Sequence, residues 1–177
     1  MGDGGAGGGT GGMGGMGDGG AGGGTGGAGG SGGGTPGDDG DACTANADCM
    51  SGMCYGDVCV ASLNGCDIDT ATDMTQMSGA TITQTGQTYN PKCQKVTVGT
   101  VLSVTANFVS HPFTAGTIEG GVRMPSTEGP FDPPTNTGGA GTTVTFTMSE
   151  QGTFPYYCNV HGPGGMNGVV FVVPDAP

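Results

Sequence analysis

Three metal-ligating side chains lie within nine residues near the end of this chain, between two apolar runs: Cys158, His161 and Met166. Their pattern is Cys-x2-His-x4-Met. A thiolate and an imidazole suit a borderline-soft transition metal, and a thioether beside them favours copper. The chain has only one other histidine, His111, so this residue is the further nitrogen ligand that the sequence offers. Two imidazoles, one thiolate and a weak axial thioether suit a copper ion that alternates between Cu(I) and Cu(II).

The cysteines indicate an oxidising compartment, because seven of them occur in a short, acidic, glycine-rich chain. Four form a cluster: Cys43, Cys49, Cys54 and Cys59. The gaps between them are wider than the close pairs typical of zinc sites, which favours two disulfides over a zinc ion. The sequence does not choose among the possible pairings. Cys66 can pair with Cys93, which leaves Cys158 without a partner and available as a ligand.

The second half of the chain predicts an all-β domain. Short runs rich in Thr and Val alternate apolar and polar residues and are separated by Gly, Pro, Asn and Asp. The expected strands are residues 80–85, 95–98, 100–108, 142–148, 153–158 and 168–173. No window keeps a helical period, so we expect a sandwich of about seven or eight antiparallel strands.

Composition divides the chain into three predicted parts. Residues 1–40 contain a repeat, Gly2–Gly12 and Gly17–Gly27, and their glycine content predicts a disordered tether. Residues 41–62 form a small disulfide-rich module, and residues 63–177 form the copper-binding domain.

Over about residues 63–173 the chain resembles the plastocyanin-like cupredoxins. The ligand loop, its place between the last two strands, the upstream histidine and the aromatic segment TFPYYC all match that family. The resemblance implies an antiparallel Greek-key β-sandwich with one mononuclear type 1 (blue) copper ion. It assigns His111 and His161 as imidazole ligands, Cys158 as the thiolate and Met166 as the axial ligand. It also implies one-electron transfer between larger redox proteins.

One position departs from the family pattern. The residue after the first histidine often donates its backbone N–H to the cysteine sulfur, but here it is Pro112, which has no N–H. We therefore expect Val160 to supply this bond from the other side, and a proline at that position to lower the reduction potential. The apolar residues Pro112, Phe113, Pro163 and Met166 are expected to form a docking patch around the exposed edge of His161.

The net charge of the chain limits which kinds of molecule it can bind. With three basic residues and a net charge of −12, the chain is unsuited to nucleic acid or anionic membranes. No apolar run is long enough for a membrane span. We expect a monomer in the bacterial periplasm or at the cell surface, with a leader that is not part of this sequence.

The same features predict that the protein is not an enzyme by itself, since no histidines remain for a second copper ion. Two other functions stay open. One is copper storage or delivery without redox turnover, and the other is a surface binding module on the same scaffold.

Overall fold

The computed structural model describes residues 35–175, so the predicted tether lies mostly outside the described residues. The helical turns and strands, in chain order, are η1 Asn46–Asp48, β1 Cys54–Tyr55, β2 Val58–Cys59, β3 Thr72–Asp73, β4 Gly79–Thr85, β5 Thr88–Asn90, β6 Cys93–Thr97, β7 Val101–Ala106, β8 Phe113–Glu119, β9 Val122–Pro125, β10 Thr142–Thr147, β11 Gly152–Cys158, η2 Gly162–Gly164 and β12 Asn167–Val173. Both helical turns are short 3-10 segments. No helix among these residues has the length and apolar character needed to span a membrane.

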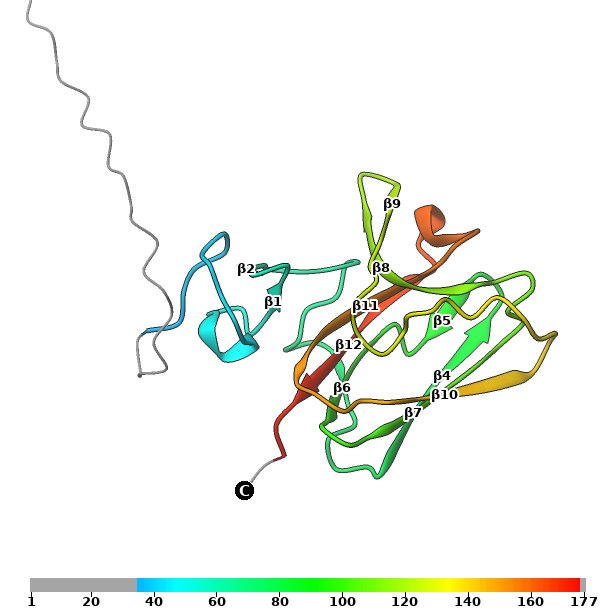
Figure 1. Ribbon diagram of the computed structural model, residues 1–177, viewed down its shortest axis with the longest axis horizontal. Helices are drawn as coiled ribbons and strands as arrows, with labels where there is room; N and C mark the ends of the chain where they lie inside the picture. The colour runs from blue at the N-terminus through cyan, green and yellow to red at the C-terminus, as the bar shows by residue number, and fades with distance from the viewer. Residues whose placement is uncertain (1–34, 176–177) are drawn as a thin grey trace, which may run out of the picture.

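Two sheets pack face to face, as the sequence predicted (Figure 1). One has the strand order β10-β7-β4-β5, and the other has the order β3-β6-β12-β11-β8-β9. Their facing side chains form one buried core, which includes Ile82, Leu102 and Val104 from the first sheet and Val170 and Val172 from the second. The all-β sandwich is therefore confirmed, and each strand expected from the sequence exists.

The pairing differs in part from the expected antiparallel order. The pairs β3–β6, β6–β12 and β4–β7 are parallel, and the others are antiparallel. Alternation of apolar and polar residues along a strand indicates which side chains are buried. The pattern is the same for parallel and antiparallel neighbours, so it could not predict the strand directions. The two sheets also hold four and six strands, more than the seven or eight expected, because β3, β5 and β9 are too short to show a pattern.

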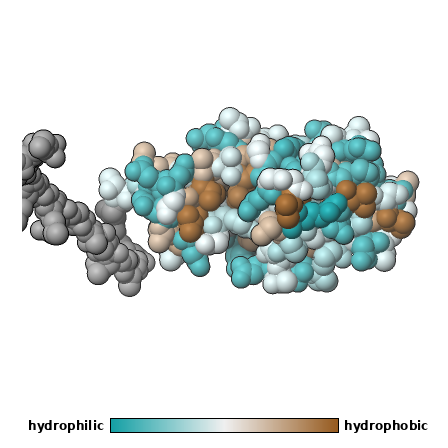
Figure 2. Space-filling view, turned by 90° about the horizontal axis from the view of Figure 1, so that it is seen from above, coloured by the Kyte–Doolittle hydropathy of each residue, from teal (hydrophilic) through white to brown (hydrophobic). Residues whose placement is uncertain are grey.

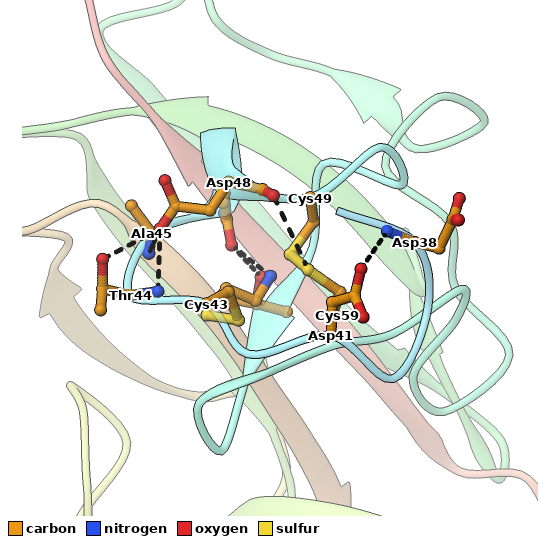
Figure 3. Close-up of a disulfide and its surroundings, with 11 residues drawn as sticks. Asp38, Asp41, Cys43, Thr44, Ala45, Asp48, Cys49 and Cys59 are labelled. Atoms are coloured by element: carbon orange, nitrogen blue, oxygen red, sulfur yellow. Dashed lines mark hydrogen bonds between the residues drawn. A yellow bond between two sulfur atoms is a disulfide. The ribbon is translucent and has the colours of Figure 1, made fainter. Parts of the chain in front are cut away.

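The cysteine-rich segment is a loop-rich unit with two disulfides, Cys43–Cys54 and Cys49–Cys59. The disulfide prediction for these four residues is thus confirmed, and so is the Cys66–Cys93 bond. Figure 3 shows the Asp48 carboxylate accepting hydrogen bonds from the backbone amides of Thr44 and Ala45 and from the Thr44 hydroxyl. These bonds lower the pKa of Asp48, with the Thr44 amide the largest contribution.

This segment covers the outer face of β12. Val169 and Phe171 point away from the sandwich core and form a second buried cluster with Met53, Leu63 and Cys66. Because its other face contributes to the main core, β12 is buried on both faces, which explains its unbroken apolar sequence. The two parts share this buried cluster. The division into residues 41–62 and 63–177 therefore remains a proposal.

Candidate metal centre

The strand register brings the distant histidine to the ligand loop. Cys158 is the last residue of β11 and pairs with Phe113, the first residue of β8. His111 lies two residues before Phe113, in the connection from β7, and therefore falls beside Cys158 despite a separation of 47 residues. Antiparallel pairing of β11 with β8 thus assembles a group that the sequence could only predict.

Three candidate ligand atoms lie close together. The Nδ1 atom of His111 lies 3.9 Å from Cys158 Sγ, and the Nδ1 atom of His161 lies 3.6 Å from it. All three atoms lie within 4.8 Å of one another. Cys158 is fully buried and, within residues 35–175, is the single cysteine outside a disulfide, while His161 is partly exposed. The group has the size and donor types of a metal site.

Met166 closes the loop that begins at Cys158. The Cys158 amide donates to the Met166 carbonyl at 2.8 Å, and the Met166 amide donates to the His161 carbonyl at 3.3 Å. Between them the chain turns through η2 and reaches Gly165, whose φ of 102° favours glycine. The Met166 side chain is fully buried, in the same core cluster as Cys158. The backbone therefore holds the predicted axial ligand on the buried side of the loop.

The cysteine sulfur accepts one backbone hydrogen bond, and its donor differs from the expected one. The N–H of His161, not that of Val160, points to Cys158 Sγ at an N···S distance of 3.4 Å. The tight turn after β11 directs the amide of the third residue back toward the thiol, which residue spacing alone did not reveal. Pro112 offers no N–H, as expected, and its carbonyl accepts from the Asn159 amide at 2.9 Å.

Aromatic side chains enclose the inner side of the group. Phe113 stacks on Tyr156 with ring centroids 4.7 Å apart, and Tyr89 meets both rings edge-on at 5.4 and 5.6 Å. The Tyr89 hydroxyl donates to the His111 carbonyl at 3.1 Å. Sequence reasoning missed Tyr89, because β5 is only three residues long and gave no signal. All three rings are buried, so this side of the site is closed to solvent-exposed surface.

The environment favours the neutral form of His111. Burial lowers the pKa of this imidazole, and the neighbouring His161 lowers it further. Neutral imidazole is the form that binds a metal. Burial also raises the pKa of Tyr89, with a further contribution from Cys158, so its phenol stays protonated and can donate.

The surface around His161 differs from the predicted docking patch. Phe113 and Met166 are fully buried and cannot contact a partner, because they pack into the core behind the ligands. Pro163 is exposed, and Val160 is 52% exposed. Figure 2 shows the apolar side chains of one face as separate patches among hydrophilic ones.

No protein-family model matches the sequence, and no curated protein matches it. Among solved structures, the chain is similar to a purple cupredoxin from Nitrosopumilus maritimus, with 25% identity over 53% of this chain and 99% of that one (TM-score 0.35). It is also similar to an auracyanin from Roseiflexus castenholzii, with 23% identity over 55% of this chain and 98% of that one (TM-score 0.37). A Cu-containing nitrite reductase from Thermus scotoductus SA-01 matches with 19% identity over 56% of this chain (TM-score 0.38), and the match spans 23% of the reductase. A cupredoxin is thus among the solved structures to which the chain is similar.

Proposed function

We propose that this protein is a mononuclear type 1 copper protein that carries single electrons between extracytoplasmic redox proteins. The observation that supports this best is the approach of two imidazole Nδ1 atoms to one buried, unpaired thiol. In an oxidising compartment a free cysteine undergoes disulfide exchange unless it is buried or bound to a metal ion. The donor set around Cys158 fits copper, and it would serve neither magnesium nor calcium, which require oxygen ligands.

His111, Cys158 and His161 would hold the ion, and Met166 would contribute a weaker thioether ligand. Copper bound there supplies a one-electron Cu(I)/Cu(II) couple. The chain contributes rigidity, since each ligand lies at or next to the end of a strand or inside a hydrogen-bonded loop. The His161 N–H stabilises the thiolate, and the aromatic wall keeps water away. Little rearrangement is then needed when the charge of the site changes by one.

The partly exposed ring of His161 offers the shortest route for an electron to leave the protein. Val160 and Pro163 beside it provide a small apolar contact, which suits the brief encounters of redox proteins. The net charge of −12 favours partners with a basic surface. Three disulfides support an extracytoplasmic location. No catalytic step is assigned to the chain, and we propose that it acts as a monomer.

The test is an absorption spectrum of the purified full chain after Cu(II) is added. We expect an intense visible band from thiolate-to-copper charge transfer, and we expect Cys158→Ser to abolish it. Met166→Leu should retain the band and change the reduction potential. Met148→Leu is the matched control, because Met148 is another fully buried methionine of the same core and should leave the potential unchanged.

A protein that stays colourless with Cu(II) would contradict the proposal. Rapid transfer of Cu(I) from the loaded protein to an acceptor, without electron exchange, would instead favour copper delivery. If copper-free protein supports the same cellular function as loaded protein, the surface binding module becomes the better explanation.

A further inference from the structure

A two-residue turn lies where the cysteine-rich segment meets the sandwich. Leu63 and Cys66 exchange backbone hydrogen bonds of 3.1 and 2.7 Å, and the residues between them, Asn64 and Gly65, have φ angles of 50° and 69°. Asn-Gly is the preferred sequence for such a turn, because both residues tolerate positive φ. The Cys66–Cys93 disulfide attaches the end of this turn to the first residue of β6. It points the Asn64 side chain at the six-stranded sheet.

The Asn64 amide binds the backbone of three strands at once. Its Nδ2 atom lies 3.3 Å from the carbonyl oxygen of Gly116 on β8, 3.0 Å from that of Tyr156 on β11 and 3.1 Å from that of Gly168 on β12. Its Oδ1 atom accepts from the Ile118 amide on β8 at 2.9 Å. Both ends of the amide are therefore used.

These hydrogen bonds form at the point where β8 stops pairing with β11. The pairing of β8 with β11 ends at Ala115 and Tyr156, and the next residue of β8, Gly116, has a φ of 125°. From there β8 diverges from β11 and pairs with β9 alone. Buried backbone groups need hydrogen-bond partners, and the Asn64 side chain supplies them where the ladder is interrupted.

We propose that Asn64 is a positioning residue for the metal centre, an inference that rests on the proposed function. Tyr156 lies two residues before Cys158, and Gly168 lies two residues after Met166. β8 follows His111, so the three strands bound by Asn64 are the three that lead to the ligands.

A second contact continues from Asn64 to the ligand loop. The Cδ1 atom of Ile118 would lie 3.0 Å from a Cβ atom placed on Gly162, the residue after His161. The backbone of Ile118 is held by Asn64, and its side chain packs against the loop. The turn that follows the cysteine-rich segment is thus linked to the ligand loop through Asn64 and Ile118.

The test removes the side chain without straining the turn. Glycine tolerates the φ of Asn64, so Asn64→Gly deletes only the hydrogen-bonding group. Asp57→Gly is the matched control, because Asp57 has a φ of 62° in the β1–β2 turn of the preceding cysteine-rich segment and is exposed. We expect Asn64→Gly to bind copper about 10- to 100-fold more weakly and to shift the visible band, as loss of a supporting contact does in metal sites. Asp57→Gly should match the wild type.

Hydrogen exchange of the metal-free protein gives a readout that needs no copper. We expect the amides of Ile118, Cys158 and His161 to exchange faster in Asn64→Gly than in Asp57→Gly. If the wild type binds no copper, the proposed function fails, and this measurement still decides whether Asn64 orders the ligand loop. Equal exchange of these amides in the two variants would overturn the positioning role.

Asn64→Asp separates the two ends of the amide. It keeps an acceptor for the Ile118 amide and loses the two N–H donors that the three carbonyl oxygens share, so we expect weaker copper binding with the Ile118 amide still protected. If Asn64→Asp or Asn64→Gly lowers stability but keeps the copper affinity and spectrum of the wild type, Asn64 only stabilises the fold, and the proposal is wrong.

Discussion

Replacement of Met53 by alanine tests whether the cysteine-rich segment is part of one cooperative fold. Met53 is fully buried at the centre of the cluster that joins this segment to Val169 and Phe171 on β12. The substitution removes three heavy atoms from a closed site and leaves a cavity beneath the sheet. Buried Met→Ala changes cost about 2–5 kcal/mol, a large part of the roughly 5–15 kcal/mol that stabilises a typical domain.

The assay is urea-induced unfolding, followed by tyrosine fluorescence because the chain has no tryptophan. We expect one transition for the wild type and one for the variant, displaced to lower urea with an unchanged slope. Met50→Ala is the control, since Met50 lies in the same segment but is 71% exposed, and it should change the free energy of unfolding by less than about 0.5 kcal/mol. A sandwich transition that stays at the wild-type urea concentration while the segment opens alone would refute this reasoning and would support the division at residue 62.

The remaining predictions concern the sulfur and one carboxylate. Val160→Pro should leave the reduction potential of the copper-loaded protein unchanged, because the donor to Cys158 Sγ is the His161 N–H. A lower potential in a redox titration would show that the Val160 N–H is the donor instead. The hydroxyl and amide of Thr75 hold the pKa of Asp73 at about 2, below its ordinary 3.8, so the stability that this carboxylate contributes is present above pH 3.8 and is lost as the pH falls toward 2. Asp73→Asn should therefore lose less stability than the wild type over that interval in urea unfolding, and equal losses would show that Asp73 is unperturbed.

The sequence alone predicted all four residues of the proposed ligand set. Cys158, His161 and Met166 lie in one loop, so their proximity follows from chain length, and the scarcity of histidine pointed to His111. Alternating runs predicted β4, β6, β7, β10, β11 and β12, because burial of one face imposes a period of two residues. They did not predict β8, whose first five residues are all buried. The free cysteine followed from pairing the other six.

Other features depend on contacts between residues far apart in the chain. The parallel strand pairs, the disulfide pairing within the cysteine-rich segment and the burial of Phe113 are set by which surfaces meet, and local pattern does not record that. The direction of one amide decided the donor to Cys158, because the turn after β11 orients His161 rather than Val160 toward the sulfur.

Asn64 shows most clearly what could not be predicted from the sequence. From sequence, its Asn-Gly pair predicts only a tight turn. The tertiary structure places that turn over the point where β8 leaves β11, and there the same side chain binds three strands. The sequence by itself determined which side chains we propose as copper ligands. Only the tertiary structure decided which residue we propose to position them, because hydrogen bonds across 52 to 104 residues form only after the sheet has assembled.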